Sequence, residues 1–333
     1  MSSAVLRDLF GRRARTLRLS VTDRCNFRCT YCMPTEDMTW FPKEGILSFE
    51  EIHRVVGLLL PAGIERLRLT GGEPTLRSGL PELVSVLAAL DGVASLSMTT
   101  NGVTMPRLGP ALHDAGLQGV TISLDTLHPR RFEQLTRRDA LGEVFAGIDA
   151  AIEAGFDPVK INVVTLRGVN DDELVDFAQF ARMKGVAVRF IEYMPLDGGS
   201  GWGPERVLPG AEAKATIEAA FPLRPRRERP EAPARPYVFA DEAPGEVGFI
   251  NPVTEPFCAR CDRLRLTADG KLKNCMFDEG EVDLMGPLRD GASDDELIGH
   301  VLECVKAKGP GGLIELKPAE AYSELRNMSR LGG

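Results

Sequence analysis

Six of the seven cysteines in this 333-residue chain fall into two groups of three. The first group, in the run CNFRCTYC, consists of Cys25, Cys29 and Cys32. A 4Fe-4S cluster has four irons, each of which takes one ligand from outside the cluster. Three thiolates leave one iron open, and an open coordination position is what a catalytic metal site needs. The spacing therefore predicts a catalytic iron–sulfur cluster here, with a structural zinc site or unrelated thiols as the alternatives.

The second group follows near the end of the chain, in the run FCARCDRLRLTADGKLKNC. Cys258, Cys261 and Cys275 again supply three thiolates, which predicts a second 4Fe-4S cluster with one open iron. A zinc knuckle is the alternative, with Cys304 or a histidine as the fourth ligand. Because Cys304 lies in a helical pattern, we interpret it instead as a small core residue.

Two glycines follow the second predicted strand, in the run LTGGEPTLR. Gly71 and Gly72 lack a Cβ atom, so their backbone can approach a ligand closely and offer it main-chain donors and acceptors. The run is not a P-loop, because the Gly-Lys-Ser/Thr ending of that motif is absent. We interpret it as a ligand-binding turn one β/α unit after the first cysteine group, with a plain turn as the alternative.

Four predicted strands each contain one basic residue among apolar neighbours, namely Arg18, Arg68, Lys160 and Arg189. A buried cation without a partner is costly. Any one of the four could point outward or form an ordinary ion pair. The four together predict a polar interior that holds an anion.

Arg263 and Arg265 follow the second cysteine group directly, with Leu264 between them. Residues two apart in a strand lie on the same face. Two guanidinium groups side by side match the oxygens of a phosphate group. The pair predicts phosphate binding beside the second cluster, and a surface strip of ion pairs is the alternative.

These residues need a scaffold, and the chain predicts six β/α units that supply it. Short β-rich runs alternate with longer amphipathic stretches. The strands are predicted at residues 17–21, 66–70, 95–99, 120–124, 159–165 and 188–193. Such alternation predicts parallel strands joined by right-handed crossovers, in an open sheet or an incomplete barrel. The basic strand interiors favour an incomplete (β/α)6 barrel, because a closed barrel is filled by apolar side chains.

The character of the chain changes after residue 195, which predicts domains of residues 1–195 and 196–333. The second domain is expected to be a smaller extension that carries the second cluster. Its short strands are predicted at residues 237–240, 247–250, 263–267 and 271–274, before a late helix. The run RPRRERPEAPARP, residues 224–236, is typical of an exposed loop, and we assign it no function.

Bulk composition excludes several classes of protein. The net charge of −8 argues against a nucleic-acid partner, because nucleic-acid-binding surfaces carry an excess of Lys and Arg. No apolar run reaches the roughly 20 residues that a membrane helix needs. The start of the chain lacks the apolar segment of a signal peptide. We therefore expect a cytoplasmic protein that binds neither nucleic acid nor membranes.

The spacing CxxxCxYC, with Tyr31 before the third cysteine, resembles the signature of the radical S-adenosylmethionine (SAM) superfamily. Over essentially the whole chain, the sequence also resembles one family within it, the GTP 3',8-cyclases (MoaA) that open molybdenum cofactor biosynthesis. The matching runs are LRLSVTDRCNFRCTYCMP, LRLTGGEPTLR, TTNG, TISLDTL, VKINVV, FIEYMPL, FCARCDRLRL and the Gly-Gly end. The second cysteine group, the arginine pair and the Gly-Gly end narrow the resemblance to this family.

The resemblance implies roles for many of these residues. It implies that the open iron of the first cluster binds SAM and that of the second binds the guanine of GTP. It implies SAM contacts from Tyr31, Gly72, Ser123 and Met194. It implies GTP contacts from Arg18, Arg68, Thr99, Lys160, Arg263, Leu264 and Arg265. It places Gly332 and Gly333 in the active site, where the sequence alone predicts a frayed chain end.

The resemblance also implies a reaction. A 5'-deoxyadenosyl radical made from SAM removes the hydrogen at C3' of GTP, and the C3' radical adds to guanine C8. The product is 3',8-cyclo-7,8-dihydro-GTP. The implied partners are GTP, an unidentified electron donor, a cyclic pyranopterin monophosphate synthase that acts on the product, and a second copy of the chain in a homodimer. The alternatives are a peptide-modifying radical SAM enzyme with an auxiliary cluster, a zinc-stabilised binding module and an inactive homologue.

Overall fold

Parallel strands form most of the fold in the computed structural model, which describes residues 5–33, 38–196, 201–277, 280–313 and 328–332. The strands are Thr16–Ser20 (β1), Arg66–Thr70 (β2), Ser95–Thr100 (β3), Gly119–Ser123 (β4), Lys160–Thr165 (β5), Ala187–Glu192 (β6), Leu223–Pro225 (β7), Arg235–Phe239 (β8), Glu246–Ile250 (β9), Arg263–Leu266 (β10), Lys271–Lys273 (β11) and Val282–Asp283 (β12). Within the described chain they form one 12-stranded sheet, in the order β12-β11-β10-β1-β2-β3-β4-β5-β6-β9-β8-β7.

Helices α1 to α6 alternate with β1 to β6, as the sequence predicts, and four more helices of the described chain follow β6. They are Phe49–Leu59 (α1), Leu80–Ala88 (α2), Met105–Asp114 (α3), Pro129–Thr136 (α4), Leu141–Glu153 (α5), Leu174–Lys184 (α6), Gly210–Ala220 (α7), Met285–Arg289 (α8), Asp294–Lys306 (α9) and Met328–Leu331 (α10). The six predicted β/α units are confirmed, because each predicted strand overlaps one of β1 to β6. These six strands pair in chain order and are all parallel.

The C-terminal part of the chain supplies both flanks of this parallel sheet. β10 lies parallel beside β1, and β9 lies parallel beside β6. The sequence predicts these strands but not their neighbours, since no local pattern shows which edge a distant strand joins. The prediction that residues 224–236 form a loop is wrong at both ends, where β7 and β8 pair as an antiparallel hairpin.

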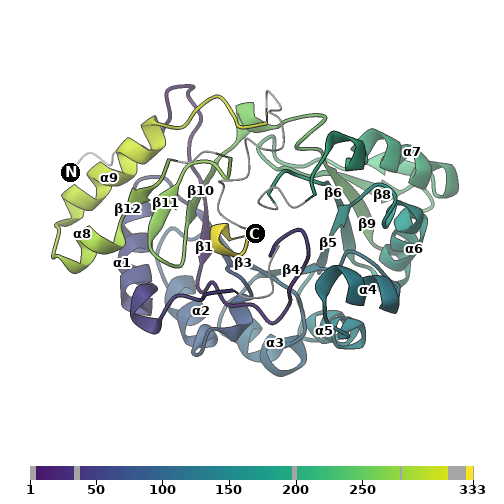
Figure 1. Ribbon diagram of the computed structural model, residues 1–333, viewed down its shortest axis with the longest axis horizontal. Coiled ribbons are helices and arrows are strands. Elements are labelled where there is room, and N and C mark those ends of the chain that lie inside the picture. The colour runs from purple at the N-terminus through teal and green to yellow at the C-terminus, as the bar shows by residue number, and fades with distance from the viewer. Residues whose placement is uncertain (1–4, 34–37, 197–200, 278–279, 314–327, 333) are drawn as a thin grey trace.

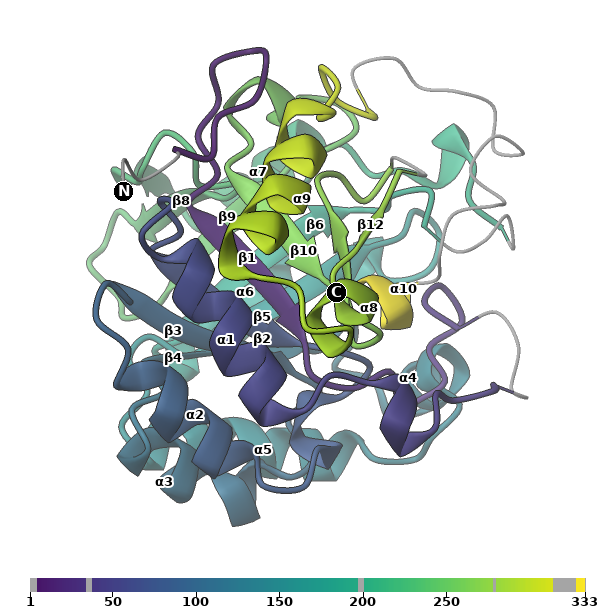
Figure 2. The ribbon, with the colours of Figure 1, turned by 90° about the vertical axis from the view of Figure 1, so that its left-hand side faces the viewer.

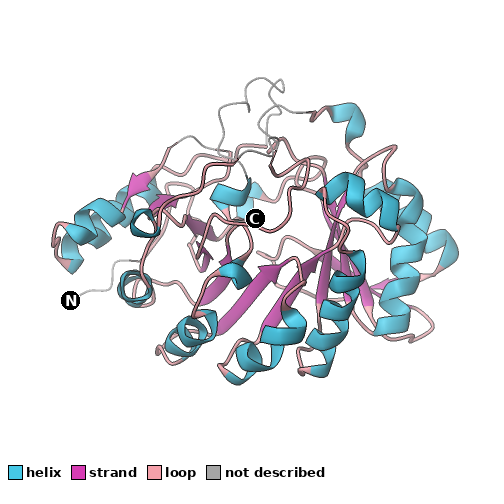
Figure 3. Ribbon diagram, turned by 60° about the horizontal axis from the view of Figure 1, so that its bottom comes forward, coloured by secondary structure: helices cyan, strands magenta, loops and turns pink. Residues whose placement is uncertain are grey.

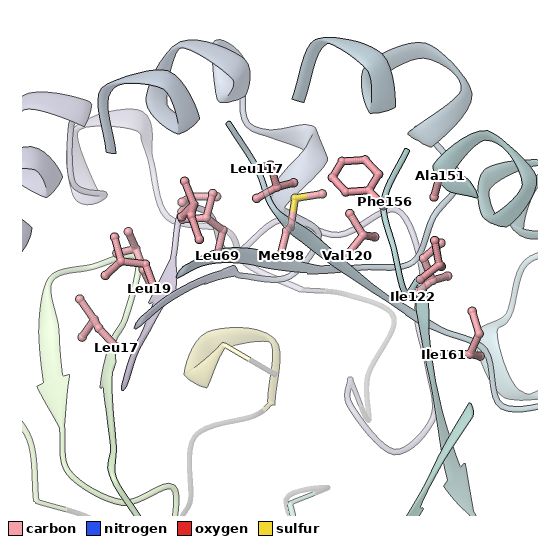
Figure 4. Packing of buried hydrophobic residues seen from close by; sticks show 14 of the residues in the cluster. Leu17, Leu19, Leu69, Met98, Leu117, Val120, Ile122, Ala151, Phe156 and Ile161 are labelled. Carbon is pink, nitrogen blue, oxygen red and sulfur yellow. The ribbon is translucent and has the colours of Figure 1, made fainter. Parts of the chain in front are cut away.

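Helices α1 to α6 cover the convex face of the sheet (Figures 1 and 3). Figure 4 shows the hydrophobic core between these layers, with Leu69, Met98 and Ile122 on the helix side of the strands. Successive side chains in a strand point to opposite faces. The residues that alternate with these apolar side chains therefore face the concave side of the sheet.

Helices α8 and α9 contact α1. Figure 2 shows α9 beside α1. Ser48 and Glu51 form a capping box at the start of α1: Glu51 N donates to Ser48 Oγ at 3.2 Å, and Ser48 N donates to the Glu51 carboxylate at 2.7 Å. Glu51 also pairs with Arg289 of α8 at 2.7 Å, and Arg54 of α1 pairs with Asp294 of α9 at 2.8 Å. These ion pairs link α8 and α9 to α1.

The last described helix, α10, lies within the curve of the sheet (Figure 1). It approaches the face that carries the polar strand residues rather than the helical layer. No helix in the described ranges is long and apolar enough to cross a membrane.

Candidate active site

The concave side of the sheet holds a cavity of about 640 Å³. Its wall includes residues of β1 to β6 and β10, of the loops after β1 and β2, and of α10. All six grouped cysteines line it, namely Cys25, Cys29, Cys32, Cys258, Cys261 and Cys275. The fold thus brings the two cysteine groups, far apart in the sequence, to a single cavity.

The first cysteine group lies on the loop that follows β1. This loop turns tightly, because the N–H groups of Cys32 and Met33 both donate to Cys29 O, at 3.0 and 2.8 Å. Burial raises the pKa of Cys25 to about 12. Burial, helped by the charges of Cys32 and Asp125, also raises the pKa of Cys29 well above its usual range. These thiols are therefore protonated when free, and a metal that they bind must displace the protons.

The loop after β2 packs main chain to main chain against the segment before the first cysteine group. Gly72 N donates to Thr22 O at 2.9 Å, and Glu73 N donates to Arg24 O at 2.7 Å. A Cβ atom would lie 2.4 Å from Arg24 O if placed on Gly72, and 2.4 Å from Thr22 O if placed on Gly71. The two glycines are therefore required for the close approach of these two loops beside the cavity.

Glu73 is a carboxylate with only 1% of its surface exposed. It accepts hydrogen bonds from the N–H and hydroxyl of Thr75 at 3.1 and 2.6 Å, from the Thr100 hydroxyl at 2.6 Å and from Asn101 N at 2.7 Å. Burial raises the pKa of Glu73, and these hydrogen bonds oppose that shift. Glu73 therefore fixes the loop after β2 to the end of β3.

Tyr31 and Asp125 connect the cysteine loop to the next part of the sheet. The Tyr31 hydroxyl donates to Asp125 Oδ2, and Val164 N donates to Asp125 Oδ1 at 2.8 Å. Burial raises the pKa of Asp125 to about 6. Both residues line the cavity, although Asp125 was not among the predicted site residues. The run TISLDTL, which contains Asp125, was the available signal.

The second cysteine group lies at the opposite end of β1. Thr16, the first residue of β1, pairs with Arg263, the first residue of β10. Cys258 and Cys261 precede β10 and so lie near the start of β1, whereas the first group follows its end. The five residues of β1 separate the two groups along the strand, a length of roughly 15 Å at about 3.3 Å per residue.

The electrostatics of the second group differ from those of the first. Burial raises the pKa of Cys258. Burial also acts to raise the pKa of Cys261, but the charges of Arg263 and Lys308 outweigh it and hold that pKa at about 6. Cys261 is therefore a thiolate near neutral pH, the form that binds iron.

Arginines occupy the middle of the cavity wall. The strand register places Arg18 of β1 between Arg265 of β10 and Arg68 of β2. Arg68 Nη1 donates to the hydroxyls of Thr99 and Thr121, at 3.3 and 3.0 Å. These neutral partners hold the Arg68 guanidinium in place and leave its charge uncompensated.

The basic side chains of the wall destabilise one another. Burial, together with the charge of Arg189, lowers the pKa of Arg68 to about 10 and the pKa of Lys160 to about 8. Burial, with the charge of Arg263, lowers the pKa of Arg265 to about 10. An anion with several negative charges would relieve this repulsion, so the cavity is suited to a polyphosphate.

The tail of the chain reaches the same cavity through α10. Gly332 O accepts a hydrogen bond from Arg265 Nη1. Gly332 has a φ of +77°, and a Cβ atom there would lie 2.4 Å from the hydroxyl oxygens of Ser20 and Thr70. Only glycine therefore fits at this position without displacement of its neighbours. Gly333 lies outside the described residues.

The cavity collects nearly all the predicted ligand contacts that the structure describes. Its wall includes the SAM set Tyr31, Gly72, Ser123 and Met194, and from the GTP set Arg18, Arg68, Thr99, Lys160, Arg263 and Arg265. Leu264 is the exception, because its side chain is fully buried in the hydrophobic core and does not line the cavity. Leu264 alternates with two inward-facing arginines, so the strand period predicts this placement.

The wall also contains residues that the sequence analysis did not assign to the site. Arg66 and Asn162 line the cavity two positions away from Arg68 and Lys160, and so share their strand faces. Residues 228, 229 and 231–234 of the Pro/Arg-rich segment line it as well. The alternation of side chains along a strand could have predicted Arg66 and Asn162, but no local sequence pattern indicates that the Pro/Arg-rich segment lines the cavity.

The described residues contain no group of three His, Cys, Asp or Glu side chains suited to a single metal ion. Cys304 is 2% exposed, and its thiol donates to Leu272 O at 3.5 Å. It belongs to the hydrophobic core, as predicted, and is not part of the cavity wall.

Comparison with known proteins assigns the family. The model of the radical SAM superfamily matches residues 19–181, and that of Molybdenum Cofactor Synthesis C matches residues 186–313. The chain is 45% identical to a GTP 3',8-cyclase of Rhodopirellula baltica, over 90% of this chain and 85% of that protein. It is 44% identical to a mitochondrial GTP 3',8-cyclase of Arabidopsis thaliana, over 99% of this chain and 84% of that protein. The chain belongs to the GTP 3',8-cyclase family.

The fold of this member of the GTP 3',8-cyclase family is similar to that of Streptococcus suis SuiB. A crystal structure of SuiB matches with a TM-score of 0.61 at 13% identity, over 87% of this chain and 68% of that chain. SuiB bound to S-adenosylmethionine matches with a TM-score of 0.57 at 13% identity, over 84% and 66%. The likeness confirms the predicted partial barrel with a C-terminal extension.

Proposed function

We propose that this chain converts GTP into 3',8-cyclo-7,8-dihydro-GTP, using SAM and two 4Fe-4S clusters. The observation that carries the proposal is one cavity with three cysteines at each end of β1 and arginines between them. Its relatives named GTP 3',8-cyclase support the choice of substrate.

The residues present fit the clusters and a polar ligand. Each cysteine group supplies three thiols that lie close enough to influence one another's charge. The Thr70 hydroxyl and the Oδ1 atom of Asn162 belong to cavity-lining residues and are buried without a hydrogen-bond partner in the described chain. A polar ligand in the cavity would satisfy such groups. Bound clusters would supply the electron that cleaves SAM and an open iron for the substrate.

The first cysteine group and its surroundings are assigned to SAM. Tyr31, Gly72, Ser123 and Met194 all line this part of the cavity wall. Glu73 holds the loop that contains Gly72, and Asp125 holds Tyr31. These buried hydrogen bonds orient the contact residues before SAM arrives, which reduces the cost of ordering them on binding.

The arginines and Lys160 are assigned to the anionic part of GTP. Charge-assisted bonds from guanidinium groups to phosphate oxygens are short and directional. When both its phosphates and its guanine are held, the ribose is fixed between them. Fixed geometry is essential here, because a carbon radical attacks any C–H bond within reach. The main chain of Gly332 packs directly against the hydroxyls of Ser20 and Thr70, where a side chain would not fit, so the tail closes this side of the site.

An anaerobic activity measurement tests the proposal. The protein is reconstituted with iron and sulfide, reduced, mixed with SAM and GTP, and its products are analysed by mass spectrometry. We expect 5'-deoxyadenosine together with a GTP-derived product that elutes differently from GTP. Deoxyadenosine with unchanged GTP would contradict the substrate assignment, and neither product at full iron loading would contradict the activity. Cys25→Ser, the control, should cleave no SAM.

A further inference from the structure

Lys308, just after α9, is a buried cation beside the second cysteine group. It is 6% exposed. Its Nζ atom donates to Arg263 O at 3.0 Å, to Cys261 O at 3.2 Å and to Cys261 Sγ at 3.5 Å. An ammonium group has three N–H donors. All three therefore have acceptors on the segment that carries Cys261.

The partners of Lys308 explain why its charge is tolerated. Two are neutral carbonyl groups, and the third is the Cys261 sulfur, which can carry a negative charge. A buried cation is costly unless a negative group compensates it. The Arg263 guanidinium interacts with the same sulfur, so two cations lie beside it. The charges of Arg263 and Arg265 act on Cys275 as well as on Cys261, whereas the Lys308 ammonium donates directly to the Cys261 sulfur.

A second buried cation holds the segment of Lys308 in place. Arg12, in the lead-in before β1, donates to Gly309 O at 2.5 Å and to Pro310 O at 2.9 Å. The same guanidinium donates to Cys258 O at 2.9 Å and pairs with Asp8 at 2.5 Å. Arg12 therefore fastens residues 308–310 to the loop of the second cysteine group, so the position of the Lys308 charge is fixed.

We propose that Lys308 is a positioning residue that raises the reduction potential of the second cluster. This inference rests on the proposed function, which places a 4Fe-4S cluster on Cys258, Cys261 and Cys275. One-electron reduction adds one negative charge, shared by the irons and thiolates, and neither forms nor breaks a bond. A fixed positive charge and an N–H···S hydrogen bond stabilise the reduced cluster more than the oxidised one.

The test uses the full chain with Cys25, Cys29 and Cys32 replaced by serine, so that only the second cluster binds. Iron content is measured first, and a redox titration followed by electron paramagnetic resonance then gives the midpoint potential. Lys308→Met should decrease the equilibrium constant for reduction by tenfold or more, which is about 59 mV for one electron. Lys308→Arg should retain most of the parent value. The matched control is Lys306→Met, which removes an exposed charge two residues earlier and should leave the potential unchanged.

Three other outcomes of this experiment also bear on the role of Lys308. Full iron loading with an unchanged potential in Lys308→Met would overturn it. If Lys308→Met fails to load iron, Lys308→Arg decides: loading upholds the need for a positive charge, and failure shows that the lysine acts by packing. A parent protein without iron would overturn the second cluster itself and this inference with it, which the iron measurement reveals before any potential is read.

Discussion

Arg265 is the residue at which several parts of the site meet. It is 5% exposed, lies beside Arg18 in the strand register, and donates to Gly332 O and to Met276 Sδ, the latter at 3.3 Å. The neighbouring cations and burial make its charge costly while no anion is bound. A phosphate bound beside Arg265 should therefore lower the electrostatic cost of this charge, so Arg265 should contribute strongly to the free energy of phosphate binding.

Arg265→Ala should weaken GTP binding by roughly 10- to 150-fold. This range corresponds to the ~1.5–3 kcal/mol of a charge-assisted hydrogen bond. Equilibrium dialysis against labelled GTP without oxygen measures the change. Arg260→Ala is the matched control, because Arg260 is exposed and lies between Cys258 and Cys261. Normal GTP affinity with loss of a cluster would show that Arg265 supports the cluster instead.

Much of the candidate site could be predicted from residue types and their spacing in the sequence. The two cysteine triplets, the strand-centred basic residues and the Arg263–Arg265 pair are local patterns, and all of them line the cavity. Asp125 and Lys308 were missed, because their importance depends on hydrogen bonds to residues far away in the sequence. The family resemblance named the whole stretch from Arg263 to Arg265, whereas the strand period places the Leu264 side chain in the core, on the face opposite the two arginines.

At the scale of elements, the loops after β1 and β2 form one unit. Hydrogen bonds join their main chains, and neither loop can move far without the other. Gly72 lies at the contact, where a Cβ atom would be 2.4 Å from two carbonyl oxygens, those of Asp23 and Arg24. Backbone atoms cannot rotate away as a flexible side chain would, so the loop before the first cysteine group must shift instead.

Gly72→Ala should therefore reduce iron loading at the first group and abolish SAM cleavage. We expect overpacking to cost about 1–3 kcal/mol as well, visible as a lower midpoint of thermal unfolding. Gly57→Ala is the control, since a Cβ atom in that part of α1 meets nothing within 4 Å. It should stabilise the protein by roughly 0.5–1 kcal/mol. Normal SAM cleavage by Gly72→Ala would show that the two loops can separate without consequence.

The position of the loop between β7 and β8 could not be predicted from the sequence. Its proline and arginine content predicts an exposed loop, and most of its side chains are indeed exposed. Six of its residues nevertheless line the cavity, Glu228 and Arg229 among them. Composition predicts that a segment lacks regular structure, but only the pairing of β8 with β9 determines what lies beneath it.

At the scale of the whole molecule, the partial barrel depends on the C-terminal part of the chain. β10 covers the edge of β1, and β9 covers the edge of β6. The division into residues 1–195 and 196–333 remains a prediction, as do the homodimer, the electron donor and the cytoplasmic location. The sequence predicts the number and order of the strands well, because both follow from local patterns.

Residues 1–195 expressed alone should aggregate. Removal of β9 and β10 leaves unpaired N–H and C=O groups along both edges of a parallel sheet, and such edges pair with other chains. Size-exclusion chromatography of the fragment and of the full chain, purified in the same way, measures the difference. A soluble, monomeric fragment that binds iron at its three cysteines would instead establish an independent domain.

The pairing of β1 with β10 has a consequence for synthesis on the ribosome. β1 leaves the ribosome first, but its partner β10 is synthesised only after most of the other strands. Throughout that interval the open edge of β1 can pair with a neighbouring nascent chain on the same messenger. When many ribosomes translate the same messenger RNA closely behind one another, misassembly should therefore be favoured. Slower initiation of translation, which spaces the ribosomes apart, should increase the yield of native protein.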